Sequence, residues 1–168
     1  MPVGRNPAPE SPIHPRVEPV AFWGVGKKVL LKEGLMIGID LLEIGRFEEA
    51  FRRRGEGFLR RIFTERELNY FYRLGPKRVV IAELAARFAA KEAVSKALGT
   101  GIKLLGSEGK VGVSWKEIEV LTKSSGKPVV VLSGRARKKA KKLGFKKVHV
   151  SLTHIKDLAL AIALVEKV

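Results

Sequence analysis

The segment from Leu84 to Leu98, LAARFAAKEAVSKAL, constrains the fold more than any other part of the sequence. On a helical wheel its apolar residues cover nearly the whole circumference, so the segment is predicted to be a helix inside the core. Glu92 and Lys96 interrupt the pattern on an arc where burial makes charge expensive unless each group is paired or binds an ion. A carboxylate and an ammonium one turn apart in a sheltered helix indicate a functional site.

The same helix carries features that allow another group to come close. One row consists of small residues, against which a second backbone or a ligand could lie: Ala85, Ala89, Ala93 and Ala97. Gly99-Thr100-Gly101 then ends the helix with a flexible turn.

Composition excludes several kinds of chemistry. The chain has 168 residues, which indicates one domain, and it has no cysteine, so disulfides, thiolate metal sites and thiol nucleophiles are excluded. Three histidines argue against a zinc enzyme. No apolar run approaches the length of a membrane span, and the N-terminus lacks the pattern of a secretory signal, so we predict a cytoplasmic protein without a membrane partner.

The charge balance points to an anionic partner. There are 33 Lys and Arg against 17 Asp and Glu, a formal net charge of +16. Such a balance predicts attraction to nucleic acid, to an acidic protein or to a phosphorylated small molecule, and charge alone does not choose among them.

The first part of the chain differs from the rest. Six of the eight prolines fall within the first 20 residues, so residues 1–35 are predicted to be a proline-rich extension, either flexible or the product of an upstream start. The domain is predicted over residues 36–168, beginning at Met36.

Strand and helix patterns are mixed within that domain. Leu35 to Asp40 has the length of a strand, contains Gly38, at which a backbone or a ligand could pass close, and delivers Asp40 at its end. The other predicted elements are a helix from Glu43 to Arg54 ended by Gly55 and Gly57, a short helix started by a capping box at Thr64–Glu67, a hairpin with strands around Val120 and Val129, a helix from Ser133 to Leu143, and two strands over residues 146–154 and 158–166. The last strand alternates Leu and Ala, a pattern that predicts packing under a helix. The order favours an α+β fold with a mostly antiparallel sheet packed against the long core helix.

Asp40 and Glu92 suggest the chemistry if they meet in space. Two carboxylates without histidine or cysteine form a hard-oxygen site suited to Mg²⁺, which completes its shell with water and substrate phosphates. Lys96 could then neutralise charge on a departing phosphate, with Lys91 and the backbone of the turn at 99–101 as further phosphate contacts. The arrangement favours phosphoryl-type transfer.

Each of these residues also has a structural interpretation. Asp40 could be the N-cap of the following helix, with Glu43 completing a capping box. Glu92 and Lys96 could form an ordinary salt bridge within one helix. His154 could be a turn residue, or it could hold a phosphate together with Ser151 and Thr153 at a strand end.

Five motifs in fixed order resemble those of one protein family. They are GIDLLEIGRF (38–47), FTERE (63–67), RFAAKEAVSKALGTGI (87–102), SGKP (125–128) and HVSLTH (149–154). From Met36 to the C-terminus the chain resembles holo-acyl-carrier-protein synthase, the bacterial 4′-phosphopantetheinyl transferase. The resemblance says nothing about residues 1–35.

The resemblance implies a reaction and roles for three residues. The family transfers the 4′-phosphopantetheine arm of coenzyme A to a serine of apo acyl carrier protein, releases 3′,5′-ADP, requires Mg²⁺ and supports fatty acid biosynthesis. By motif position Asp40 and Glu92 would be the metal ligands and catalytic residues, and Lys96 would act at the phosphate. Either Glu92 or a metal-bound water would take the serine proton.

The resemblance also implies the partners. Arg46 would dock the acidic carrier, with Arg53 and Arg54 as helpers. The implied coenzyme A contacts are Lys91, Gly99, Thr100, Gly101, Ser151 and His154. The fold would be that of the 4′-phosphopantetheinyl transferases, and the chain would form a homotrimer with each active site between neighbouring subunits.

Two other classes of function are weighed against the enzyme. A basic nucleic-acid-binding module is suggested by residues 135–147, which hold eight Lys or Arg and no acid, but aromatics interleaved with basic residues are missing. We therefore predict no nucleic-acid partner. The other class is a scaffold without catalysis, in which Glu92 and Lys96 form only a salt bridge.

Overall fold

A computed structural model describes residues 35–73, 77–102 and 112–167. The predicted extension, apart from Leu35, lies outside the described residues. So do the residues between Ile102 and Gly112.

The described part of the chain alternates between strands and helices. In order, the elements are β1 (Leu35–Glu43), α1 (Ile44–Arg54), α2 (Glu56–Ile62), α3 (Glu65–Phe71), α4 (Lys77–Ala97), the 3₁₀ helix η1 (Trp115–Glu117), β2 (Ile118–Thr122), β3 (Pro128–Leu132), α5 (Gly134–Lys142), β4 (Phe145–His154) and β5 (Leu158–Lys167).

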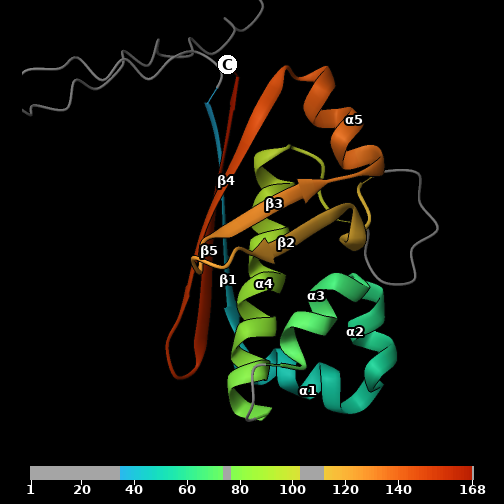
Figure 1. The fold of residues 1–168 in the computed structure, drawn as a ribbon, viewed down its shortest axis with the longest axis vertical. Coiled ribbons are helices and arrows are strands. Elements are labelled where there is room, and N and C mark those ends of the chain that lie inside the picture. Colours follow the sequence, from blue (N-terminus) through green and yellow to red (C-terminus); the bar gives the residue numbers. More distant parts are fainter. Residues whose placement is uncertain (1–34, 74–76, 103–111, 168) are drawn as a thin grey trace, which may run out of the picture. The chain divides into compact units, whose positions relative to one another are not determined.

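Two antiparallel sheets frame the long helix α4. One has the strand order β1-β5-β4, and the other is the hairpin β2-β3. Figure 1 shows α4 beside the three-stranded sheet, with α1, α2 and α3 near one end of the helix and α5 near the other. This arrangement confirms the predicted α+β class and the predicted long core helix.

Strand β5 shows why the sheet packs so closely on α4. Its inward residues Ala159, Ala161 and Ala163 are buried, while leucines and an isoleucine alternate with them on the other face. The small inward side chains let the helix lie close to the strand. The alternation of Leu and Ala in the sequence predicted this packing.

Strand β1 comes even closer to α4, at Gly38. A Cβ at this position would overlap the carbonyl oxygen of Ala93 and would come within 2.6 Å of the nitrogen of Ala97. The predicted approach of a backbone to the alanine row is therefore confirmed, and the glycine is required for it. Asp40 is two residues after Gly38, so its side chain leaves the strand on the same face.

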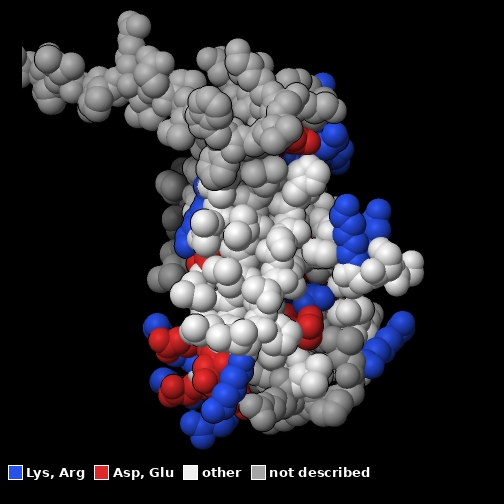
Figure 2. Space-filling model, turned by 90° about the vertical axis from the view of Figure 1, so that its left-hand side faces the viewer, with Lys and Arg blue, Asp and Glu red and all other residues white. Residues whose placement is uncertain are grey.

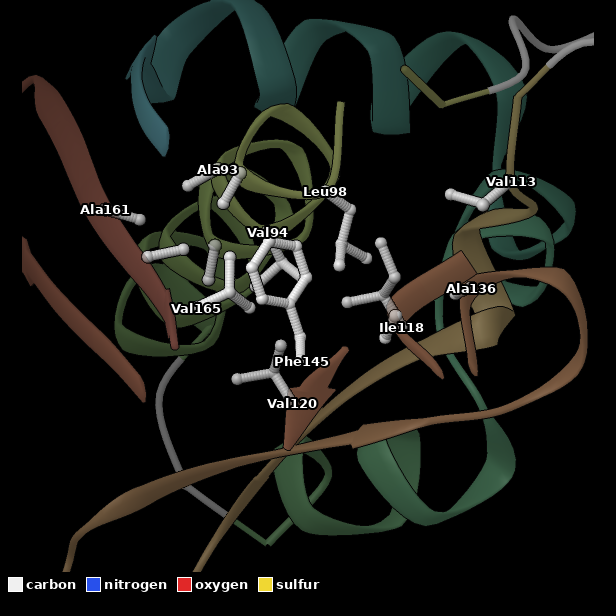
Figure 3. Packing of buried hydrophobic residues seen from close by; sticks show 14 of the residues in the cluster. Ala93, Val94, Leu98, Val113, Ile118, Val120, Ala136, Phe145, Ala161 and Val165 are labelled. Atoms are coloured by element: carbon white, nitrogen blue, oxygen red, sulfur yellow. The ribbon is translucent and has the colours of Figure 1, made fainter. Parts of the chain in front are cut away.

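The core beyond α4 is built around Phe145. In Figure 3 its ring lies among side chains from α4 and β2, including Val94, Leu98 and Val120. All three of these neighbours are almost completely buried. The hairpin and β4 are thereby joined to the helix through apolar contacts.

Local predictions at the start of α1 need correction. Asp40 does not cap this helix, because β1 continues through Glu43, and Glu43 stands at the N-cap position without a side-chain cap hydrogen bond. The stop at Gly55 is right, since Gly55 has φ +62°. Gly57, predicted to help end the helix, instead lies inside α2, a helix that the sequence analysis missed.

The second capping box is confirmed. The Thr64 side chain accepts from the backbone N–H of Glu67, and the Glu67 side chain accepts from the backbone N–H of Thr64 at 2.8 Å.

None of the described helices is long and apolar enough to cross a membrane.

Candidate active site

Asp40 and Glu92, 52 positions apart in the sequence, face the same small region. Asp40 comes from β1 and Glu92 from the part of α4 that packs on β1. Burial raises the pKa of the Glu92 carboxyl, and the nearby charge of Asp40 raises it further, while Lys96 lowers it. The two acids are therefore close enough to repel one another, which is the arrangement that a divalent cation relieves.

The donor set of this region fits Mg²⁺ chemically. It consists of carboxylate oxygens, and the described residues contain no cluster of three or more His, Cys, Asp or Glu that could hold a metal. A cation held by Asp40 and Glu92 would thus keep open positions for water and for substrate oxygens. This is the coordination typical of Mg²⁺ bound together with a phosphate-bearing ligand.

Lys96 binds Asp40 rather than Glu92. Its Nζ donates to Asp40 Oδ1 at 2.8 Å and to the carbonyl oxygen of Ile39 at 3.0 Å. The interpretation of Glu92 and Lys96 as a simple pair within one helix is therefore wrong. The expected shelter is also wrong for Lys96, whose side chain is 52% exposed, whereas Glu92 is half-buried.

Lys91 does not reach the site, which corrects its prediction as a phosphate contact. Its side chain is 0% exposed, and its Nζ donates to Glu67 Oε2, Trp115 O and Ile118 O. An ammonium has three N–H donors, so none remains for a phosphate. The helical pattern did not show this, because Lys91 lies beside Glu92 in sequence but on a different face of α4.

The Gly99-Thr100-Gly101 turn ends α4 as predicted. Gly99 and Gly101 have φ +63° and +64°, and the Thr100 hydroxyl lies 3.3 Å from the carbonyl oxygen of Ser95. The two glycines are exposed and Thr100 is half-buried. Their contact with a phosphate stays a prediction.

Ser151 and His154 are both exposed on β4, but they do not share a face. They are three residues apart on a strand, so their side chains leave it on opposite sides. Strand β5 separates β4 from β1, which carries Asp40. Within one chain these residues do not form a single pocket with Asp40.

The arginines predicted to dock a partner are exposed on α1, and two of them border a cavity. The cavity has a volume of about 480 Å³, and Arg46, Arg54 and Glu92 all line it. Its other lining residues are mainly apolar: Leu42, Phe47, Ala50, Phe58, Phe88, Ile102 and Trp115. Arg53 is exposed but is not part of this lining.

Sequence reasoning missed the aromatic wall of this cavity. The rings of Phe88 and Trp115 lie 4.3 Å apart between centroids, and Trp115 is brought to α4 from 23 residues beyond Glu92. The 3₁₀ turn before β2 places it there, and the sequence signal for this turn is the capping box formed by Ser114 and Glu117.

Comparisons with known proteins agree on one family. The model of the 4′-phosphopantetheinyl transferase superfamily matches residues 36–163. A holo-[acyl-carrier-protein] synthase from Herpetosiphon aurantiacus is 44% identical over 127 residues, which cover 76% of this chain and 94% of the relative.

Solved structures of holo-[acyl-carrier-protein] synthases are also similar to this chain. One from Bacillus anthracis, in complex with CoA (3′,5′-ADP), has a TM-score of 0.60 and 38% identity, and the match covers 79% of this chain and 96% of that one. One from Helicobacter pylori, in complex with coenzyme A, has a TM-score of 0.63 and 28% identity, and the match covers 78% of this chain and 100% of that one.

Proposed function

The chain belongs to the 4′-phosphopantetheinyl transferase superfamily, and from that premise we infer that it is a holo-[acyl-carrier-protein] synthase. It moves the 4′-phosphopantetheine arm of coenzyme A to a serine of apo acyl carrier protein and releases 3′,5′-ADP. The observation that carries this inference is the convergence of Asp40 and Glu92 beside the exposed ammonium of Lys96.

Asp40 and Glu92 are the residues that would hold Mg²⁺. When bound, the ion supplies charge neutralisation at the pyrophosphate of coenzyme A. The half-buried position of Glu92 and the nearby charge of Asp40 support this role, because both disfavour a lone carboxylate there.

The chain's own residues account for the proton transfers. The serine oxygen of the carrier forms a bond to the phosphorus that bears the pantetheine, and the bond from that phosphorus to the oxygen of the leaving 3′,5′-ADP breaks. Glu92 is positioned to take the serine proton, and a water molecule is the alternative base. Lys96, whose ammonium is half exposed, stabilises or protonates the leaving phosphate.

Arg46, Arg53 and Arg54 are the proposed docking residues for the acidic carrier. All three are exposed, and Arg46 and Arg54 border the cavity that Glu92 also lines. A carrier held there by charge attraction would bring its serine to the end of α1 nearest the two carboxylates. The net charge of +16 supports the same kind of partner.

Coenzyme A contacts by Gly99, Thr100, Gly101, Ser151 and His154 are part of the proposal. Lys91 is not, because it is buried. Since Ser151 and His154 point to opposite sides of β4, they could serve one ligand only if it bridges an edge of the sheet or if neighbouring subunits contribute to the site.

A homotrimer would supply such neighbours. The outer face of the β1-β5-β4 sheet exposes large apolar side chains, with Ile37 58%, Ile39 52%, Leu41 60% and Ile162 41% exposed. Figure 2 shows a largely uncharged area on this side of the molecule, with acidic and basic side chains at its lower end and along its edges. Exposed apolar patches of this kind are typical of subunit interfaces.

The cellular compartment and the pathway are also part of the proposal. We place the reaction in the cytoplasm and in the service of fatty acid biosynthesis, as the family resemblance implies.

The decisive experiment is a mass measurement. Apo acyl carrier protein, coenzyme A, Mg²⁺ and the purified protein should yield carrier heavier by one phosphopantetheine group, and 3′,5′-ADP should appear in equal amount. The matched control is Glu92→Gln, which keeps the shape of the side chain and removes its charge. This variant should lose the Mg²⁺-dependent modification of the carrier. If the carrier mass stays unchanged at every Mg²⁺ concentration, the proposed activity is wrong.

A further inference from the structure

A buried ion pair outside the site has no part in the reaction described above. Glu67 of α3 and Lys91 of α4 are both 0% exposed, and Lys91 Nζ lies 2.9 Å from Glu67 Oε2. Burying two charges is costly, and well-packed apolar side chains of similar volume are often as stable or more so. Stability alone therefore does not explain this pair.

Lys91 joins three parts of the fold through its ammonium group. Besides Glu67, it donates to the carbonyl oxygens of Trp115 at 3.2 Å and Ile118 at 2.6 Å. These carbonyls belong to η1 and β2. Strand β2 packs on α4, and the Trp115 ring of η1 packs on Phe88 of α4. Every N–H of the ammonium is thus directed at a fixed acceptor.

Glu67 completes the network from its own side. Its Oε1 accepts from the backbone N–H of Val120 at 2.9 Å, and its Oε2 accepts from the backbone N–H of Thr64 at 2.8 Å. The carboxylate therefore links β2 to the start of α3 as well as to α4. A group with this many directed partners tolerates little displacement.

Helix α4 is held on two sides, and Glu92 lies between the two anchors. Lys91 fixes the helix to η1 and β2. Ala93 contacts Gly38 of β1, where no side chain separates the two backbones. Consecutive residues of a helix point about 100° apart. These two contacts together therefore determine the direction in which Glu92 points.

Alanine is the most frequent buried residue of α4, at Ala85, Ala86, Ala89, Ala90, Ala93 and Ala97. Arg87, which is also buried, adds one directed contact to β2, because its guanidinium donates to the Thr122 hydroxyl at 2.8 Å. A smooth alanine surface allows several rotations of nearly equal packing energy, whereas a buried ion pair with directed hydrogen bonds allows one. Specifying register is the best-attested role of buried polar groups.

The same pair also places one wall of the cavity. Lys91 holds the carbonyl of Trp115, and the Trp115 ring packs on Phe88 with 4.3 Å between centroids. Both rings line the cavity that contains Glu92.

We propose that Glu67 and Lys91 are positioning residues of the active site: their buried ion pair fixes the rotation of α4 so that Glu92 meets Asp40, and it holds Trp115 against the cavity. This inference rests on the proposed function, because the site that is positioned is the metal site of the transferase. Neither residue touches substrate.

The test replaces both charges at once, with Glu67→Met and Lys91→Met in one protein, so that no unpaired charge is left. Mn²⁺ is the probe, and its binding in the presence of coenzyme A is followed by electron paramagnetic resonance well below the melting temperature. We expect the double variant to remain folded and to bind Mn²⁺ about tenfold more weakly or worse. In carrier modification kcat should fall, while KM for the carrier stays close to the wild-type value because the α1 arginines are untouched.

Two controls separate positioning from a general loss of stability. Leu68→Ala removes packing from the same helix α3, and Arg66→Met removes the ion pair between the exposed Arg66 and the buried Glu119. Both should bind Mn²⁺ as the wild type does. Glu67→Asp, which keeps the charge but shortens the side chain, serves if the double variant does not fold, and it should weaken Mn²⁺ binding by a smaller factor.

The outcomes are distinct. If the double variant, or Glu67→Asp in its place, binds Mn²⁺ and turns over as the wild type does, the pair is only structural and the inference is wrong. If wild-type protein binds Mn²⁺ but modifies no carrier, the proposed function fails, while the comparison of Mn²⁺ affinities still decides the role of the pair.

Discussion

Two lysines on helix α4 make almost identical ion pairs in very different surroundings. Lys91 Nζ lies 2.9 Å from a carboxylate oxygen of Glu67, and Lys96 Nζ lies 2.8 Å from one of Asp40. The Lys91 side chain is 0% exposed and the Lys96 side chain is 52% exposed. Distance alone therefore does not distinguish the two.

The surroundings give the two pairs different roles. In the core, neither Lys91 nor Glu67 can exchange its partner for water, so the pair is permanent and orders the helices around it. At the edge of the site, Lys96 can turn from Asp40 to an arriving phosphate, because water reaches its half-exposed ammonium. A lysine can act on a substrate only where it can leave its partner.

The largest effect should come from breaking the buried pair on one side. Lys91→Met leaves the Glu67 carboxylate buried without a counter-charge, so we expect a loss of about 3–5 kcal/mol in the free energy of unfolding. Urea unfolding at fixed protein concentration measures it. A loss below about 1 kcal/mol would show that Glu67 finds another partner or takes up a proton.

Replacing Lys96 should have the opposite pattern of effects to replacing Lys91: little change in stability and a large loss of activity. Lys96→Met removes an ammonium that is half exposed, so the free energy of unfolding should change by no more than about 1 kcal/mol. Turnover of carrier should fall about 100-fold, since the charge opposite the leaving phosphate is lost. Comparing urea unfolding with single-turnover rates checks both statements, and an unchanged rate would remove Lys96 from the mechanism.

A smaller effect is expected where charge only guides the carrier. Arg46→Glu on α1 should raise KM for the carrier about tenfold at low salt, and the difference from wild type should narrow as salt is added. Lys138→Glu on the exposed face of α5 makes the same change of charge away from α1 and is the matched control. Equal effects of the two would mean that only net charge matters, not the docking surface.

The smallest expected effect is a change in the pH dependence of stability when Glu92 is replaced by Gln. Burial and the Asp40 charge raise the pKa of this carboxyl in the folded protein. The ionised form is therefore disfavoured by folding at neutral pH, and the folded state takes up its proton first as the pH falls. Glu92→Gln mimics the protonated form.

In the presence of a chelator, Glu92→Gln should therefore melt slightly higher than wild type at neutral pH. The difference should shrink as the pH falls from above the raised pKa to below the ordinary value for glutamate. Melting curves across that range measure it. A variant that melts lower than wild type at neutral pH would contradict the assigned environment of Glu92.

Periodic patterns in the sequence were enough for the main elements. The apolar circumference of residues 84–98 predicted the core helix, and the alternation of Leu and Ala predicted the inner face of β5. Gly38 and the alanine row predicted a close approach of two backbones. Each of these features begins as a pattern of small or apolar residues within one segment, which the sequence displays directly.

Contacts between distant segments were not predictable in this way. The sequence predicted Lys96 as the group acting on the departing phosphate and Lys91 as a further phosphate contact, and it offered Asp40 as a helix cap. The partners that decide these roles lie 56 residues from Lys96, at Asp40, and 24 residues from Lys91, at Glu67.

The amino-acid sequence by itself determined that α4 is buried and that it carries charges a core helix should not have. Only the tertiary structure decided which charge is locked in the core and which stays available for chemistry. The physical reason is that helical periodicity specifies the direction of a side chain relative to its own helix. Its exposure to water and its choice of partner depend on which other element covers that side.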